Sequence, residues 1–252
     1  MCFDTDSEPP IPRIAGAAVS HDELTLTSAD GTQFAAFLAT PDETAAAGVV
    51  ILPDVRGLYH FYEELALRFA ERGYPALAID YFGRTAGAEK RDEHFEYSPH
   101  VDQTTDDNVQ ADTQAAIDKL RELGVHAVFT VGFCFGGRAS WVAAASGHGL
   151  SGAVGFYGSP TRERGGASPV ARALHVESPI LALQAGADPH ITADDNAAFG
   201  AALTGAGVEH EIVEYAGAPH SFFDRKQEEF QAASDDAWQR TLDWFDGHLD
   251  PA

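Results

Sequence analysis

The sequence is poor in lysine, cysteine and long apolar runs. Lys90, Lys119 and Lys226 are its only lysines, and 39 acidic residues outnumber 16 basic ones to give a net charge of −23. This charge argues against nucleic acid or an anionic membrane surface as a partner. No apolar run approaches the roughly 18 residues of a membrane-spanning helix, and the acidic N-terminus does not resemble a signal peptide.

Cysteine is too scarce for a disulfide framework. Cys2 and Cys134 are the only cysteines, and Cys2 lies near an end of the chain that we expect to be loose. Such usage is typical of a protein in the reducing cytoplasm. Histidine and cysteine do not cluster at the spacing of zinc ligands, so the sequence predicts no metal site.

No boundary divides the chain into domains. A linker rich in proline and serine is missing, and 44% of the residues are hydrophobic, which is enough for a large core. We therefore expect a single domain over residues 1–252, in which residues 1–20 form an irregular, proline-rich N-terminal extension.

Strand-like and helix-like segments alternate along the chain. Expected strands cover residues 23–28, 34–40, 48–53, 75–80, 127–131, 151–157, 179–185 and 208–215, the first two joined by a hairpin at Asp30-Gly31. Expected helices cover residues 62–72, 105–123, 139–145, 194–204 and 238–249, and residues 81–104 and 158–177 are long loops. This order predicts an α/β fold, a mostly parallel twisted sheet with helices on both faces, whose ligands bind beyond the carboxyl ends of the strands.

A cysteine stands between one of these strands and the helix after it. The segment Gly132-Phe-Cys-Phe-Gly-Gly137 has the pattern of a nucleophile elbow with Cys134 in the position usually held by serine. Gly132 and Gly136 suit a turn in which side chains would collide. The amino end of the helix would lower the pKa of the thiol. The alternative is a buried, unreactive cysteine in a glycine-rich turn.

An acid and a histidine follow later strands. Asp188 comes after the strand at 179–185, and His220 follows the last strand. Nucleophile, acid and histidine occur in this order in α/β-hydrolases. Each residue alone could be a loop cap or a surface histidine, but all three at strand ends predict a Cys134-His220-Asp188 triad.

These motifs resemble those of the dienelactone hydrolase family over roughly residues 20–250. The resemblance is carried by Gly132–Gly137, Gly186–Asp188, Pro219–Phe222, Pro53–Leu58 and Asp80–Arg84. It implies the α/β-hydrolase fold and the hydrolysis of a carboxylate-bearing enol-lactone through a covalent acyl-enzyme. It further implies aromatic degradation as the setting, no metal or cofactor, and a monomer or small homo-oligomer acting on a small lactone or ester.

The resemblance also suggests roles for three further positions. Arg84 matches a family arginine that binds the substrate's carboxylate. Asp54 stands where the best-known members have a glutamate that contacts the resting thiol. The position of a second family arginine, four residues beyond the histidine, holds Asp224, and Arg225 comes one residue later. Alternatives are a solvated loop arginine at Arg84 and, for Asp54, a helix cap or a local ion pair with Arg56.

A mechanism follows from these assignments. Cys134 attacks the lactone carbonyl, and the N–H groups of Phe135 and Val55 hold the oxyanion, as the fold provides. His220 moves protons and Asp188 fixes its tautomer.

Three other functions compete with this one. A general carboxylesterase would use the same triad without needing a carboxylate on the substrate. A glyoxalase-like or amidotransferase-like cysteine enzyme is disfavoured, because amidotransferases have glutamate two residues after the histidine, where this chain has Phe222. A non-catalytic ligand-binding protein on the same fold usually lacks a triad member, and none is missing here.

Overall fold

The structure is a computed structural model that describes residues 3–4, 6–43, 46–92 and 94–249. The described residues form an eight-stranded sheet in the order β1-β2-β4-β3-β5-β6-β7-β8. The strands are β1 Val19–Thr27, β2 Gln33–Pro41, β3 Ala47–Leu52, β4 Ala76–Ile79, β5 Ala127–Phe133, β6 Gly152–Phe156, β7 Ile180–Ala185 and β8 His210–Tyr215. Strand β2 is antiparallel to β1 and β4, and every other pair is parallel. The predicted α/β sheet is confirmed.

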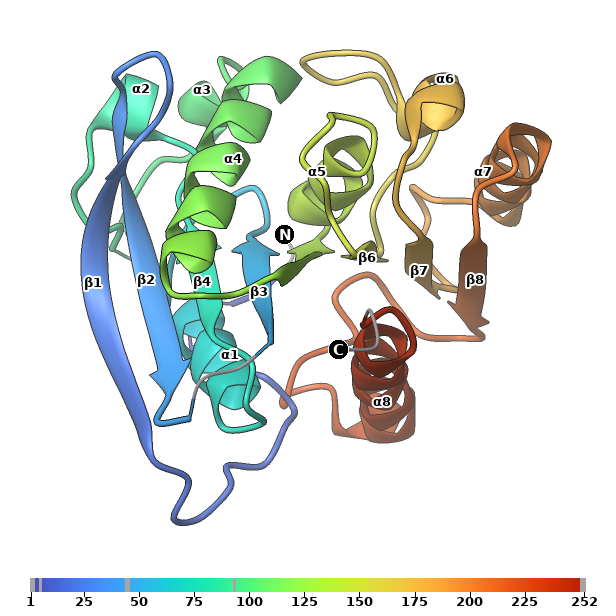
Figure 1. Ribbon diagram of the computed structural model, residues 1–252. Helices are drawn as coiled ribbons and strands as arrows, with labels where there is room; N and C mark the ends of the chain where they lie inside the picture. The colour runs from blue at the N-terminus through green and yellow to red at the C-terminus, as the bar shows by residue number, and fades with distance from the viewer. Residues whose placement is uncertain (1–2, 5, 44–45, 93, 250–252) are drawn as a thin grey trace.

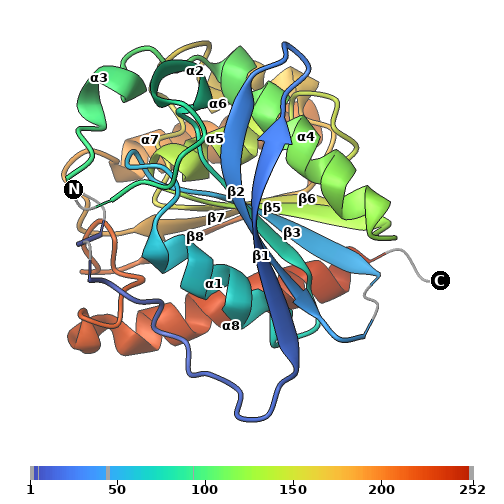
Figure 2. The ribbon, with the colours of Figure 1, turned by 90° about the vertical axis from the view of Figure 1, so that its left-hand side faces the viewer.

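Helices cover both faces of the sheet. The main helices are α1 His60–Ala70, α4 Asp106–Glu122, α5 Phe135–Ala143, α7 Ala193–Ala206 and α8 Gln231–Gly247. Figures 1 and 2 place α1 and α8 on one face and α4, α5 and α7 on the other. The central strands are buried on both sides, which explains their nearly continuous apolar sequences. None of the described helices is long and apolar enough to cross a membrane.

The two expected long loops contain short helices. These are α2 Gly83–Ala86, α3 Ser98–Val101 and α6 Pro169–Arg172, followed by a 3₁₀ turn at Ala173–His175. A helix of one turn has no apolar period, so the sequence pattern cannot reveal it. Helix α5 begins at Phe135, earlier than expected. The sequence pattern missed its first turn because that turn contains two glycines, which are poor helix formers.

The N-terminal extension packs closely against the domain. Phe3 is 2% exposed, and its ring stacks on Phe61 of α1 with centroids 3.9 Å apart. Ser7 is fully buried and donates a hydrogen bond to Asp224. The segment is irregular before β1, as expected, but its described part from Phe3 to Ile11 is not loose. Cys2, which we expected at a loose end, lies outside the described residues.

Candidate active site

Cys134 occupies a strained turn between β5 and α5. Its backbone has φ 55° and ψ −109°, a conformation that residues other than glycine rarely adopt. A Cβ atom on Gly132 would lie 1.9 Å from the carbonyl oxygen of Gly136, and one on Gly136 would lie 1.9 Å from that of Leu52. The two glycines are therefore sterically required. The turn places Cys134 at the N-cap of α5, where the helix dipole favours a thiolate.

His220 and Asp188 meet beyond the ends of β8 and β7. The Nδ1 atom of His220 lies 2.5 Å from Oδ2 of Asp188. The other carboxylate oxygen accepts a hydrogen bond of 2.8 Å from the N–H of His190. Burial raises the pKa of Asp188, but the hydrogen bonds from His220 and His190 outweigh it, so the pKa lies below its usual value. The carboxylate is thus charged and fixes the orientation of the imidazole ring.

The third interaction joins His220 to Cys134. Burial lowers the pKa of His220, but hydrogen bonds to Asp188 and to Cys134, with the charges of both, raise it to about 9. An imidazolium beside the thiol at neutral pH is the partner that a thiolate needs. The tilted ring of Tyr157 lies 4.9 Å from the imidazole ring, centroid to centroid. The structure therefore brings all three predicted triad residues together.

Backbone strain gathers at this site. Among the described residues other than glycine, those with positive φ are Cys134, Tyr157 and Ser221, with φ of 55°, 38° and 65°. They are the candidate nucleophile, a residue beside the histidine, and the residue after His220. Each such conformation costs about 1–3 kcal/mol and persists only where the surroundings hold it. Three strained residues around one cavity are typical of a functional site.

A cavity of about 450 Å³ opens onto Cys134 and His220. Val55 and Phe135, whose N–H groups we expect to hold an oxyanion, both line it. As the first residue of α5, Phe135 has an N–H with no acceptor inside that helix. The cavity has the size of a site for a small organic molecule.

Arg84 lies outside this cavity and is held elsewhere. Its Nη1 donates hydrogen bonds of 3.0 and 2.7 Å to the two carboxylate oxygens of Asp112, and its Nε donates one of 2.9 Å to Asp30. A fourth hydrogen bond, of 3.2 Å, runs from Nη2 to the hydroxyl of Ser28. The structure does not bring Arg84 together with Cys134, because the buried carboxylate of Asp112 on α4 takes up its guanidinium. The position of Arg84 therefore does not support the predicted contact with a substrate carboxylate.

Asp54 is fully buried just beyond β3. One carboxylate oxygen accepts a hydrogen bond of 2.9 Å from the N–H of Arg56. The other lies 3.2 Å from the hydroxyl of Tyr59, which donates to it, and 3.5 Å from the guanidinium of Arg56. Burial lowers the pKa of Arg56, but the charge of Asp54 contributes to a net rise. The ion pair with Arg56 is therefore present, whereas the N-cap of α1 is Tyr59 and not Asp54.

Arg225 also lies away from the cavity. Its guanidinium is 2.5 Å from a carboxylate oxygen of Glu8, and its side chain is 63% exposed. Asp224 beside it is buried and accepts the hydrogen bond from Ser7. Neither position of the expected second arginine therefore faces Cys134.

Three arginines that the sequence analysis did not single out do line the cavity. They are Arg138 on α5 and Arg162 and Arg164 in the loop between β6 and α6. This loop follows the carboxyl end of a parallel strand, where ligands bind in such sheets. Because segment 158–177 follows an expected strand of a parallel sheet, this rule could have identified Arg162 and Arg164 as candidates from the sequence.

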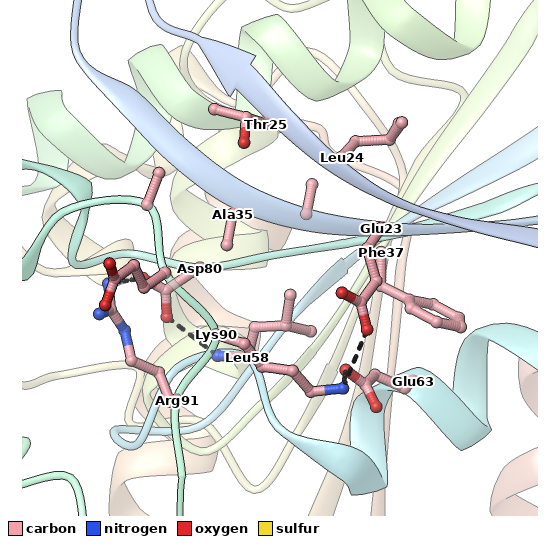
Figure 3. A pocket seen from close by; sticks show the side chains of 13 residues that line it. Glu23, Leu24, Thr25, Ala35, Phe37, Leu58, Glu63, Asp80, Lys90 and Arg91 are labelled. Atoms are coloured by element: carbon pink, nitrogen blue, oxygen red, sulfur yellow. Dashed lines mark hydrogen bonds and ion pairs between the residues drawn. The ribbon is translucent and has the colours of Figure 1, made fainter.

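A second cavity, of about 220 Å³, lies between β1, β2 and the segment before α3 (Figure 3). Most of its charged side chains are paired: Lys90 is 2.7 Å from Glu63 and 3.3 Å from Glu23, and Arg91 is 2.9 Å from Asp80. Among the described residues that line it there is no cysteine, serine or histidine. This cavity therefore lacks the cysteine and histidine that line the larger one.

Comparison with known proteins gives a consistent result. Residues 34–249 match the model of the dienelactone hydrolase family. An Escherichia coli K12 protein named "Putative carboxymethylenebutenolidase" is 30% identical over 231 residues, covering 88% of this chain and 85% of its own. The "Carboxymethylenebutenolidase" of Rhodococcus opacus is 27% identical over 99% of this chain and 98% of its own. The crystal structure titled "Putative Dienelactone Hydrolase" from Klebsiella pneumoniae superposes with a TM-score of 0.80 at 27% identity, covering 90% of this chain and 98% of its own.

Proposed function

The chain belongs to the dienelactone hydrolase family and is a hydrolase of the ester or lactone type, and we propose that it opens a small, carboxylate-bearing enol-lactone through an acyl-enzyme on Cys134. The observation that carries the proposal is the contact of His220 with both Asp188 and Cys134 at the end of the sheet. This arrangement is the one that nucleophilic acyl transfer requires.

The first half-reaction would form the acyl-enzyme. The thiolate of Cys134 attacks the carbonyl carbon, and the N–H groups of Phe135 and Val55 stabilise the negative charge that develops on the carbonyl oxygen. The ring C–O bond then breaks as the thioester forms. The departing enolate is stable enough to leave with little help, and it takes its proton from the imidazolium of His220.

The second half-reaction would release the product. His220, now neutral, takes a proton from a water molecule that attacks the thioester carbonyl. The C–S bond breaks, the carboxylic acid product leaves, and thiolate and imidazolium are restored. Asp188 keeps the proton of the ring on Nδ1, so that Nε2 is the atom that exchanges protons with Cys134 and with water.

Asp54 stays a candidate for control of the thiol. Its buried carboxylate stands one residue before Val55, which lines the same cavity as Cys134. A negative charge near a thiol disfavours the thiolate and raises its pKa. We propose that Asp54, neutralised in part by Arg56, moderates the reactivity of the resting enzyme.

A general carboxylesterase is the main competing function, and one experiment separates the two. Purified protein is assayed with a carboxymethylene butenolide, with the methyl ester of the same lactone, and with a simple aryl acetate. The proposal requires the free acid to be the best substrate by kcat/KM. A preference for the aryl acetate would instead indicate a general esterase.

The role of the thiol is tested in the same assay. Cys134→Ala should abolish turnover of the lactone without unfolding the protein, and the matched control Cys2→Ala should retain it. Substantial turnover by the Cys134→Ala enzyme would contradict the acyl-enzyme mechanism. The backbone oxyanion donors remain in Cys134→Ala. Each such donor is typically worth about 10²–10³ in rate, so any activity left without the thiol should be weak.

A further inference from the structure

The catalytic cavity is positively charged although the chain is strongly acidic. Its lining includes Arg138, Arg162 and Arg164 and two histidines, and none of the described residues that line it is an aspartate or glutamate. The whole chain carries a net charge of −23. A local excess of positive charge in such a chain favours an anionic ligand at this site.

The three arginines differ in how their charges are balanced. Arg138 is 4% exposed and binds Asp106 through two hydrogen bonds of 2.6 and 3.1 Å, so its guanidinium is held in an ion pair, although Asp106 also pairs with Arg172 at 3.1 Å. Arg164 has only a long contact of 3.7 Å to the exposed Asp102. Across the part of the chain that the structure describes, the guanidinium of Arg162 makes no hydrogen bond or ion pair. Two of the three arginines are thus available to a ligand.

Arg138 fixes the loop that carries the other two. It donates hydrogen bonds of 3.0 Å to the carbonyl oxygens of both Arg162 and Ala167, and a longer one of 3.4 Å to that of Gly166. A Cβ on Gly166 would lie 2.3 Å from a carboxylate oxygen of Asp106, so glycine lets the loop approach closely. The arginines therefore stand on a preformed support, and less entropy is lost when a ligand binds.

The charge of Arg164 also acts on the nucleophile. Burial lowers the pKa of Arg164, the charges of Arg162 and Arg138 lower it further, and those of Asp102 and Cys134 raise it. The guanidinium lies 5.7 Å above the ring of Phe135, the residue after Cys134. An anion beside Arg164 would thus be close to the thiol that attacks.

We propose that Arg162 and Arg164 form the subsite that binds the carboxylate of the substrate, in place of Arg84 and Arg225. The planar guanidinium matches a carboxylate through paired hydrogen bonds, and two of them facing one cavity suit a single acidic group. This inference rests on the proposed function for the identity of the ligand, but its test does not depend on hydrolysis.

Alkylation of Cys134 measures the subsite directly. Iodoacetate carries a carboxylate and iodoacetamide does not, and both react with the same sulfur. In a Cys2→Ala background, the ratio of the two alkylation rates is compared among the parent and the variants Arg162→Gln, Arg164→Gln and Arg225→Gln. The ratio should fall roughly 10-fold in each of the first two, the loss expected for one charge-assisted hydrogen bond. It should not change in Arg225→Gln, which removes an equal charge outside the cavity.

Hydrolysis supplies the second readout. For the lactone acid, Arg162→Gln and Arg164→Gln should raise KM about 10-fold each, with little change for its methyl ester, and Arg164→Lys should recover part of the loss. An unchanged alkylation ratio in both variants, or an equal fall in Arg225→Gln, would overturn the subsite. If neither lactone is hydrolysed while the ratio responds as expected, the subsite stands and the proposed activity fails.

Discussion

Ser7 donates a hydrogen bond of 2.6 Å to the buried carboxylate of Asp224, across 217 positions of the sequence. Asp224 lies four residues after His220, so this contact ties the N-terminal extension to the loop that carries His220. The N–H of Arg225 adds a bond of 3.0 Å to the carbonyl oxygen of Glu8. Phe3 packs nearby against Tyr157, which contacts the ring of His220. The extension thus supports the histidine side of the candidate active site.

The first prediction concerns this support. Ser7→Ala leaves a buried carboxylate oxygen without its donor and should lower the free energy of unfolding by about 1–3 kcal/mol, measured by urea denaturation. Lys226→Gln is the matched control, since it breaks exposed ion pairs to Asp4 and Asp6 that contribute little. Equal stabilities of the two variants would show that the extension does not depend on the Ser7–Asp224 contact.

The second prediction concerns Arg84. Its guanidinium pairs with Asp112, whose side chain is 1% exposed, so Arg84→Gln leaves a buried carboxylate without its cation. The free energy of unfolding should fall by about 3–5 kcal/mol. The double variant with Asp112→Asn should recover much of this loss, because no buried charge remains. The preference for a lactone acid over its methyl ester should not change in either protein. A lost preference at full stability would place Arg84 in the substrate site after all.

The parts of the site that follow strand ends could be predicted from the sequence. Cys134, Asp188 and His220 follow separate strands of a parallel sheet, and the carboxyl ends of such strands meet at one edge. Glycine at 132 is required by local sterics against Gly136, and the elbow pattern is recognisable in a short stretch, although Gly136 itself is also required by the carbonyl oxygen of Leu52 on the neighbouring strand. These features depend on short stretches of sequence and on a general rule of the fold.

Long-range partners could not be predicted in this way. The spacing that made Arg84 look like a substrate ligand does not reveal that Asp112, on α4, competes for it. The sequence likewise does not show that Ser7 reaches Asp224, or that Arg138 binds the loop of Arg162 through its carbonyl oxygen. Each contact joins residues far apart in sequence, and only the packed structure decides among their possible partners.

The third prediction concerns Asp54. Asp54→Asn removes a buried negative charge and should speed alkylation of Cys134 by neutral iodoacetamide, because the thiolate becomes easier to form. The variant also leaves Arg56 without its counter-ion, so stability is measured in parallel. Arg56→Gln is the control: it breaks the same ion pair but keeps the carboxylate, so alkylation should be slower than in Asp54→Asn. An alkylation rate equal to that of the parent would assign Asp54 a purely structural role.

The fourth prediction concerns the protonation of His220. Its pKa is about 9, although burial opposes the charge, because hydrogen bonds and charges from Asp188 and Cys134 favour it. Cys134→Ala removes one of these contributions and should lower the pKa of His220. Proton NMR of the imidazole ring measures the shift, with the signal assigned by comparison with His220→Gln. Titration at the same pH in the parent and in Cys134→Ala would contradict a thiolate–imidazolium pair.

The same proton links stability to pH. The pKa of His220 is higher in the folded state, about 9, than its ordinary value of 6.5. The folded protein therefore holds the proton more tightly, and the stabilisation is complete below pH about 6.5 and is lost as the pH rises through about 9. In Cys134→Ala, where no thiol titrates, the unfolding free energy should fall as the pH rises from about 6.5 through the lowered pKa of the histidine. In the parent the fall should begin only near the ordinary pKa of a thiol, about 8.5, because below that pH the proton that the unfolded chain holds on Cys134 matches the one that the folded state holds on His220. Parallel pH profiles for the two proteins would mean that Cys134 contributes nothing to the charge on His220, and the thiol would then have to be activated by α5 alone.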